Sequence, residues 1–126
     1  MDRHRVSSGS PFESTIGFSR AIRTGPYVAV AGTAPIWPDG SCDPDPYVQT
    51  RRCLDIIAAA LAEVGATLDQ VVRTRMFLTD ASDQEAVGRA HGDVLGSIRP
   101  AATMVVVQGL IDPRWKVEIE ADAWLG

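Results

Sequence analysis

The sequence predicts an α+β fold in which a mixed β-sheet carries two helices on one face. Three observations favour this class. Short segments with strand-like composition lie near both ends of the chain, two segments with helical spacing lie between them, and one more strand separates the helices. The expected order is therefore β-β-α-β-α-β-β, with an additional weaker strand at residues 3–7.

A hairpin is predicted in the N-terminal part of the chain. Residues 19–24 and 27–32 have the composition of two strands, and Gly25-Pro26 joins them, although this is not a favoured turn pair. The next segment, 35–46 (PIWPDGSCDPDP), is rich in Pro, Asp and Gly. We interpret it as a long surface loop.

The clearest helix follows this loop. Its apolar positions recur at spacings of three and four, which places them on one helical face. They are Thr50, Cys53, Leu54, Ile57, Ala60, Leu61 and Val64. Gly65 is expected to end this helix as a C-cap.

A strand and a second helix are predicted next. Residues 71–79 (VVRTRMFLT) alternate, so that Val72, Thr74, Met76 and Leu78 share one face and Arg73, Arg75 and Phe77 share the other. Ser82 and Glu85 have the spacing of a capping box that opens a helix. The buried stripe of that helix is Val87, Ala90, His91, Val94, Leu95 and Ile98, and Arg99-Pro100 is expected to end it.

Two strands close the chain. Residues 103–108 (TMVVVQ) form a nearly continuous apolar run. Residues 117–125 alternate strictly, with Val117, Ile119, Ala121, Ala123 and Leu125 on one face and Glu118, Glu120, Asp122 and Trp124 on the other.

The expected position of both helices on one face of the sheet predicts an obligate oligomer. Two helices cover only one face of a sheet of five or six strands. The uncovered face would carry Phe77, Trp124 and part of the 103–108 run. Exposed apolar surface of this kind marks an interface, so subunits are expected to bury this face against each other.

Length and composition predict one globular domain, residues 1–126. Hydrophobic residues make up 45% of the chain, the net charge is −4, and Lys116 is the only lysine. An acidic chain without a basic block is not expected to bind nucleic acid or an anionic membrane. No apolar run is long enough for a membrane span, and the N-terminus does not resemble a secretory signal, so a cytoplasmic location is expected.

No metal or cofactor is expected. Cys42 and Cys53 lack metal-ligand spacing and are interpreted as reduced thiols. His4 and His91 are the only histidines, and no phosphate-binding glycine motif occurs. His91 is interpreted as a hydrogen-bonded core or interface residue in preference to a general base.

Charged side chains of two predicted strands give two open interpretations. Glu118, Glu120 and Asp122 share one strand face, and Arg73 and Arg75 share another. If these faces meet, they form either an anion-binding pocket with a carboxylate that activates water, or ion pairs that fix an oligomer interface. Spacing alone favours the ion pairs.

Several segments, in order along nearly the whole chain, resemble the RidA/YjgF family of enamine/imine deaminases. They are Gly17–Ala21 (GFSRA), Val30–Thr33 (VAGT), Gln49–Arg51, Ala60-Leu61, Gly65, Leu68, Val71–Thr74, Asp80, Arg99–Thr103 (RPAAT) and Val117–Ala121 (VEIEA). The resemblance implies a chorismate-mutase-like fold and a homotrimer with a central β-barrel. It also implies small-molecule clefts between adjacent subunits.

The resemblance implies hydrolysis of short-lived imines or enamines, with the family glutamate at Glu118 as the group that activates water. Implied substrate-binding positions are Phe18, Ala31, Gly32, Thr33, Ala102 and Thr103. The family motif Pro-Ala-Arg-Ser/Thr reads Pro100-Ala101-Ala102-Thr103 here, so alanine replaces the arginine that binds the substrate carboxylate. Phe18 and Ala31 replace a tyrosine and a serine of the family.

With these departures the chain resembles a branch of the family that lacks the catalytic arginine, and two hypotheses remain. One is a hydrolase that uses Glu118 with a relocated cation from Arg73, Arg75 or Arg99. The other is a non-catalytic trimer that binds a small ligand. The loss at Ala102 disfavours the archetypal deamination of 2-iminopropanoate. Nuclease activity, which is attached to the family by name, is disfavoured by the acidic charge.

Overall fold

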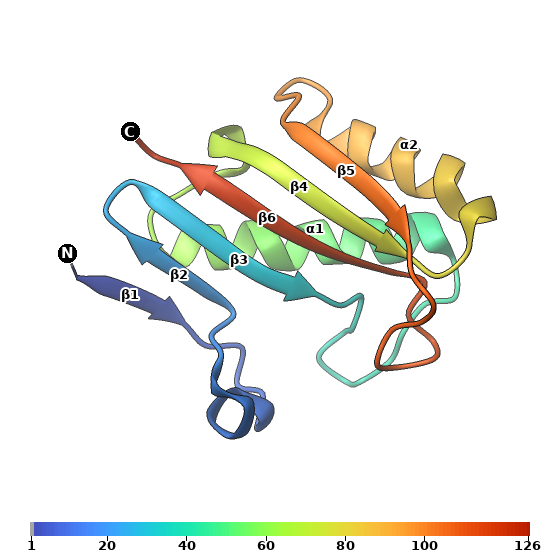
Figure 1. Cartoon of the computed structure of the whole chain (residues 1–126), viewed down its shortest axis with the longest axis horizontal. Helices are drawn as coiled ribbons and strands as arrows, with labels where there is room; N and C mark the ends of the chain where they lie inside the picture. Colours follow the sequence, from blue (N-terminus) through green and yellow to red (C-terminus); the bar gives the residue numbers. More distant parts are fainter. Residues whose placement is uncertain (1) are drawn as a thin grey trace.

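A single six-stranded sheet forms the frame of the molecule in the computed structural model, which describes residues 2–126 (Figure 1). The strands are β1 (Arg3–Val6), β2 (Ala21–Thr24), β3 (Tyr27–Thr33), β4 (Val71–Leu78), β5 (Ala101–Val106) and β6 (Val117–Trp124). Their spatial order is β1-β2-β3-β6-β4-β5. All neighbours are antiparallel except β4 and β5, which are parallel, so the sheet is mixed as predicted.

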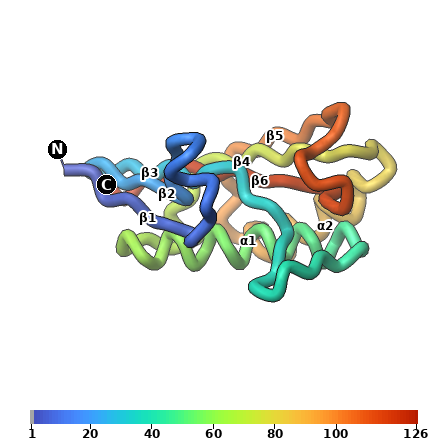
Figure 2. Tube along the Cα trace, turned by 90° about the horizontal axis from the view of Figure 1, so that it is seen from below, coloured from blue at the N-terminus to red at the C-terminus, as the bar shows by residue number. Residues whose placement is uncertain are grey.

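Both helices, α1 (Pro46–Glu63) and α2 (Gln84–Leu95), lie on the same side of the sheet (Figure 2). The core forms between them and the sheet, where Leu54, Ile57 and Leu61 of α1 are fully buried. On β6, Val117, Ile119, Ala121 and Ala123 are buried, whereas Trp124 on the other face is 53% exposed. The sequence prediction of one covered face and one open face is therefore confirmed.

Helix α1 begins before the periodic stripe that predicted it. The side chain of Asp45 accepts hydrogen bonds from the backbone N–H groups of Tyr47 and Val48, and Pro46 occupies the first helical position. The loop predicted at residues 35–46 therefore ends at Asp45. At the other end Gly65 has a φ of +79°, and its N–H donates to the carbonyl of Ala62, which confirms it as the terminating glycine.

The predicted capping box at the start of α2 is wrong. Asp80 accepts hydrogen bonds from the Ser82 backbone and hydroxyl, which opens a 3₁₀ turn at Ala81–Asp83 before α2 begins. Glu85 instead pairs with Arg89 one turn along the helix. Ser82, which the sequence pattern assigned to capping, is therefore already hydrogen-bonded to an aspartate two residues earlier in the chain.

The ends of other elements also differ from the prediction. Helix α2 ends at Leu95, before the expected stop at Arg99-Pro100, and Arg99 has a φ of +54°. β5 begins at Ala101, two residues earlier than expected, and β2 begins at Ala21. A five-residue π-helix, Glu13–Gly17, lies where no element was predicted.

A β-bulge corrects the predicted face of Val72. The register of β4 against β6 shifts between Val71 and Arg73, which adds one residue to β4. Val72 is therefore 49% exposed, whereas Val71 and Thr74 are buried. The alternation that predicted an inward Val72 holds only from Thr74 onward.

No helix within residues 2–126 is both long enough and apolar enough to span a membrane.

Candidate functional site

Glu118 lies on the open face of the sheet, on a strand with neighbours on both sides. β6 runs between β3 and β4, and Glu118 is opposite Phe77 of β4. On the β3 side the register shifts between Val30 and Thr33, and Gly32 lies within this irregular stretch. A Cβ atom built on Gly32 would collide with Glu118 Oε2. The carboxylate therefore lies directly against the backbone of Gly32, which leaves room for no larger residue.

Arg20 is the second charged residue beside Gly32, and no sequence pattern indicated a role for it. The backbone N–H of Arg20 donates to the carbonyl of Val6, and its backbone carbonyl accepts from the N–H of Ala31. The backbone of Arg20 is therefore held between β1 and β3. Its Nη2 donates to the carbonyl of Gly32. Its Nε is buried without a hydrogen-bond partner among residues 2–126. Arg20, which directly precedes β2, and Glu118 of β6 therefore approach the same glycine from two different parts of the chain.

The environment moves the pKa values of both groups. Burial raises the pKa of Glu118, the positive charge of Arg20 opposes that rise, and the negative charge of Glu120 adds to it. Burial lowers the pKa of the Arg20 guanidinium, and the charge of Glu118 opposes this. In the part of the chain described, the two side chains form no ion pair within 4 Å. A half-buried carboxylate with a raised pKa is a better proton acceptor than an exposed one.

A second polar cluster occupies the middle of the open face. Arg75 Nη1 lies 3.3 Å from Glu120 Oε1 and 3.5 Å from Asp122 Oδ2. The Tyr27 hydroxyl donates to Asp122 Oδ1 at 3.2 Å. The structure thus joins the carboxylate and arginine faces that the sequence placed on separate strands. The Arg75 guanidinium is engaged by two carboxylates of its own chain.

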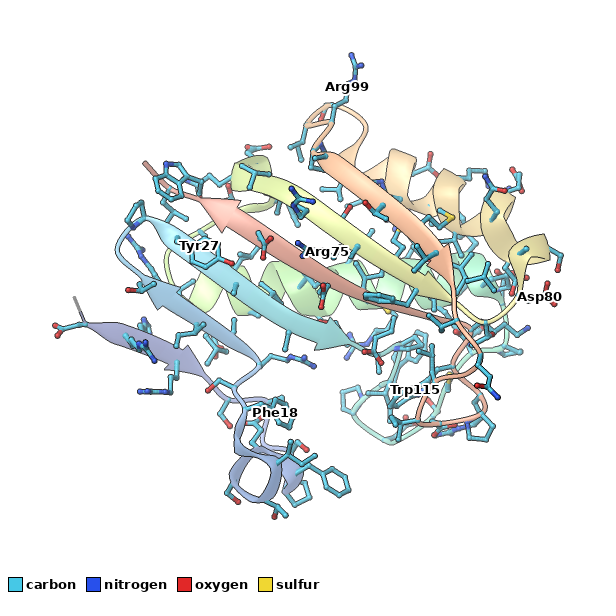
Figure 3. The ribbon with its side chains drawn as sticks, in the orientation of Figure 1. Phe18, Tyr27, Arg75, Asp80, Arg99 and Trp115 are labelled. Atoms are coloured by element: carbon cyan, nitrogen blue, oxygen red, sulfur yellow. The ribbon has the colours of Figure 1, made fainter. Side chains whose placement is uncertain are left out.

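An open cavity of about 720 Å³ connects this cluster to the N-terminal segment. Phe18, Ala31 and Arg75 line it, together with Glu120 and Asp122. Phe18 follows the π-helix directly and lies at the opposite end of the sheet from Arg99 (Figure 3). Of the residues proposed to bind substrate, the structure brings together Phe18, Ala31 and Arg75 at this cavity.

The remaining proposed binding residues lie elsewhere in the chain. Thr33 is fully buried, and its hydroxyl donates to the Ala31 carbonyl. Arg73 and Thr103 are exposed on β4 and β5. Arg99 is exposed in the turn after α2 and points away from the sheet (Figure 3).

Ala102 lies on the opposite face of the sheet from Glu118. It pairs with Thr74, whose side chain is buried toward the helices, whereas Glu118 pairs with the open-face residue Phe77. β5 is also an edge strand, so Ala102 is exposed. Within one chain, the segment that carries the family arginine position therefore does not meet Glu118.

The side chains of His91 and both cysteines are buried or half-buried. His91 Nε2 and Thr74 Oγ1 share a hydrogen bond of 2.8 Å, which confirms the hydrogen-bonded histidine, and burial lowers the pKa of His91. Cys53 is completely buried, and burial raises the pKa of its thiol. Burial also raises the pKa of the half-buried Cys42. No group of His, Cys, Asp and Glu side chains in residues 2–126 has the arrangement of a metal site.

Comparison with known proteins defines the class of protein to which this fold and glutamate belong. The family model described as "Endoribonuclease L-PSP" matches residues 9–125. The chain belongs to this family, which is the RidA/YjgF family that the sequence resemblance indicated.

Individual relatives match most of the chain. An uncharacterized protein of Streptomyces coelicolor, SCO2049, is 44% identical over 97% of this chain and 92% of its own. A RutC family protein of Pyrococcus abyssi is 34% identical over 74% of this chain and 75% of its own. The crystal structure of Rv2704 from Mycobacterium tuberculosis, a member of the YjgF/YER057c/UK114 family, is 50% identical and covers 98% of this chain and 99% of its own, with a TM-score of 0.90. The match to this structure confirms the predicted α+β fold class.

Proposed function

We propose that this protein hydrolyses an imine or enamine of a small carboxylate metabolite, with Glu118 activating water. The observation that carries the proposal is the position of Glu118: half-buried, against Gly32, with a pKa raised by burial. A carboxylate in such surroundings accepts a proton from water more readily than one in bulk solvent.

The reaction needs one base and no redox partner. An enamine first becomes the imine by moving a proton from its nitrogen to the far carbon of its C=C bond. Water then adds to the C=N carbon while its proton passes to Glu118, and Glu118 returns that proton to the nitrogen. The resulting carbinolamine has one hydroxyl and one amine on the same carbon. Transfer of the hydroxyl proton to nitrogen then releases ammonia and leaves a 2-keto acid. One water is consumed, and Glu118 is regenerated.

We further propose that the working unit is a homotrimer with its clefts between subunits. In support, the open face exposes Val105 and Trp124, and the outer edge of β5 has no strand beside it. Ala102 and Glu118 are on opposite faces of one sheet, so a cleft that contains both positions needs two copies. A closed ring of subunits also removes the exposed edge.

We also propose where the protein is located and what it binds. We place the chain, as one domain of residues 1–126, in the cytoplasm, with a small-molecule ligand and without nucleic acid, membrane, metal or cofactor. The net charge of −4 supports this, because RNA binding and nuclease function favour a basic surface.

The test generates 2-aminoacrylate from serine with a dehydratase and follows the release of the keto acid. We expect the protein to accelerate this step and Glu118→Gln to remove at least 90% of the acceleration, about a tenfold loss. Glu63→Gln, an exposed glutamate at the end of α1, is the matched control and should retain full activity. Equal rates with and without the protein would contradict the proposal.

The second candidate is a trimer that binds a small ligand without turning it over. Two observations favour it: Ala102 has no polar group, and Phe18 lines the cavity with a ring that lacks a hydroxyl. Calorimetric titration with pyruvate distinguishes the candidates. Saturable binding without any acceleration of imine hydrolysis supports the second one.

A further inference from the structure

A small carboxylate ligand beside Glu118 requires a cation, and the arginines proposed from the sequence do not supply one within this chain. Arg75 is already paired with Glu120 and Asp122. Arg73 is exposed on β4, and Arg99 is exposed in the turn that precedes β5. The arginine that does lie beside Glu118 is Arg20.

We propose that Arg20 binds the carboxylate of the ligand beside Glu118 and so performs the role for which position 102 has only an alanine. This inference rests on the proposed function, because it concerns the ligand of the same site. It narrows the ligands to small anions whose carboxylate is directly bonded to the reacting carbon.

The hydrogen bonds of Arg20 support this role. One end of its guanidinium is fixed, because Nη2 donates to the carbonyl of Gly32. The Nε–H group of the same guanidinium is buried and has no hydrogen-bond partner among residues 2–126. An unsatisfied buried donor costs about 1–3 kcal/mol, so a site that retains one is expected to gain an acceptor when it is occupied. A carboxylate binds arginine through parallel hydrogen bonds of this kind.

The position of Glu118 supports it as well. Glu118 Oε2 lies against the Cα of Gly32, and Arg20 holds the carbonyl of the same residue. The two side chains do not form an ion pair, so the guanidinium is not occupied by Glu118. In a 2-imino acid the carboxylate and the carbon attacked by water are adjacent atoms. A cation and a base that both contact one glycine match a ligand of that size.

Ligand binding at Arg20 would also change Glu118. The charge of Arg20 opposes the rise in the Glu118 pKa that burial causes. A bound carboxylate offsets that charge, so the pKa of Glu118 rises further when the ligand binds. The ligand therefore makes Glu118 a stronger base at the time it is needed.

The experiment measures the binding of pyruvate by calorimetry, with Arg20→Met against Arg23→Met as the matched control. Arg23 is also half-buried and on β2, but its Nη1 donates to the Val64 carbonyl near the end of α1. We expect Arg20→Met to weaken pyruvate binding at least tenfold and Arg23→Met to change it less than twofold, relative to the unsubstituted protein. Ala102→Arg added to Arg20→Met reveals whether the family position restores binding.

Two further measurements keep the result decisive. Arg20→Lys keeps the charge and loses the parallel donors, so it should weaken binding even if Arg20→Met does not fold. A carbon-13 NMR titration of the unsubstituted protein should show a higher Glu118 pKa with saturating pyruvate than without it. Pyruvate binding that is unchanged in Arg20→Lys and Arg20→Met, or absent from the unsubstituted protein, overturns the inference.

The outcomes also separate this inference from the proposed function. If imine hydrolysis is absent but pyruvate binding depends on Arg20, the hydrolase proposal fails and the ligand site remains. If Glu118→Gln loses turnover but Arg20→Met binds pyruvate normally, the hydrolase stands and Arg20 is not its carboxylate-binding residue.

Discussion

Gly32 determines where the carboxylate of Glu118 lies. The two residues are on neighbouring strands, and the register shift between Val30 and Thr33 brings the Gly32 backbone under the glutamate side chain. A residue with a Cβ would force the carboxylate to move, because backbone atoms cannot retreat as a flexible side chain can. At this site the absence of a side chain on Gly32 allows Glu118 of the neighbouring strand to take its position.

Gly32→Ala is therefore expected to displace the Glu118 carboxylate but to lower the free energy of unfolding by less than about 1 kcal/mol, because the clashing atom is the end of a flexible side chain. The displacement should change the Glu118 pKa measured by carbon-13 NMR, and urea denaturation should report the loss of stability. Gly109→Ala is the control, since a Cβ at Gly109 has no atom within 4 Å. An unaltered Glu118 titration in Gly32→Ala would show that the contact is not tight.

Glu118→Gln is expected to stabilise the folded protein at neutral and higher pH. Because burial raises the folded pKa of Glu118 above its ordinary value of 4.5, the folded state binds its proton more tightly than the unfolded state. The stability contributed by this group therefore falls as pH rises through the folded pKa. The gain from Glu118→Gln should be largest at pH 8 and should shrink toward pH 4.5 in chemical denaturation. A gain that is the same at both pH values would contradict the assignment of burial as the cause.

His91 is expected to destabilise the fold in acid. Burial lowers its folded pKa below its ordinary value of 6.5, so its stabilising contribution is present above pH 6.5 and is lost as pH falls through the folded pKa. The variant His91→Gln keeps a group that can bond to Thr74 but does not titrate. Between pH 7 and pH 5, the free energy of unfolding should fall less steeply in this variant than in the unsubstituted protein.

At the scale of elements, the ends of helices depend on side chains that periodicity does not reveal. The apolar stripe of α1 predicted its middle correctly, but Asp45 and Pro46 set its start. Asp80 replaced the expected serine as the capping residue before α2. Periodicity reports which face is buried, whereas termination depends on single local hydrogen bonds.

Two glycine substitutions in the helical layer should have opposite effects. Gly92 lies inside α2 with no atom near a built Cβ, so Gly92→Ala should raise the free energy of unfolding by about 0.5–1 kcal/mol. Gly65 follows α1 with a φ of +79°, so Gly65→Ala should lower it by about 1 kcal/mol. Urea denaturation of both variants checks the signs, and stabilisation by Gly65→Ala would contradict the assigned backbone role.

At the scale of the whole molecule, one face of the sheet has no cover within the chain. The helices occupy the other side, and apolar residues of β4, β5 and β6 remain exposed. Burial of such surface stabilises by roughly 25 cal/mol per Å², which supports the proposed association of copies through this face. In the proposed trimer, the β5 segment of one copy lies near Glu118 of another.

Light scattering on the purified protein is expected to give about 40 kDa, three times the 13.5 kDa of one chain. Val105→Asp places a charge on the open face and should shift the mass toward the monomer. Ala62→Asp, on an exposed position of α1, is the control and should leave the mass unchanged. A monomeric unsubstituted protein would contradict the trimer and the inter-subunit cleft together.

The sequence by itself determined the local and periodic properties of this protein. Alternation on residues 117–125 separated the buried face from the acidic face, and the α1 stripe identified a helix with one apolar side. These patterns are readable because side-chain direction repeats every two or 3.6 residues. A set of segments along nearly the whole chain, the motif around Glu118 among them, also indicated the family, which the comparisons confirm.

Only the tertiary structure decided which strands became neighbours. β6, the last strand of the chain, lies between β3 and β4, and this placement brings Glu118 onto Gly32 and beside Arg20. The β4 bulge turned Val72 outward, and the register of β5 placed Ala102 on the face away from Glu118. Strand order and register depend on contacts between residues far apart in sequence, and local periodicity does not encode those contacts.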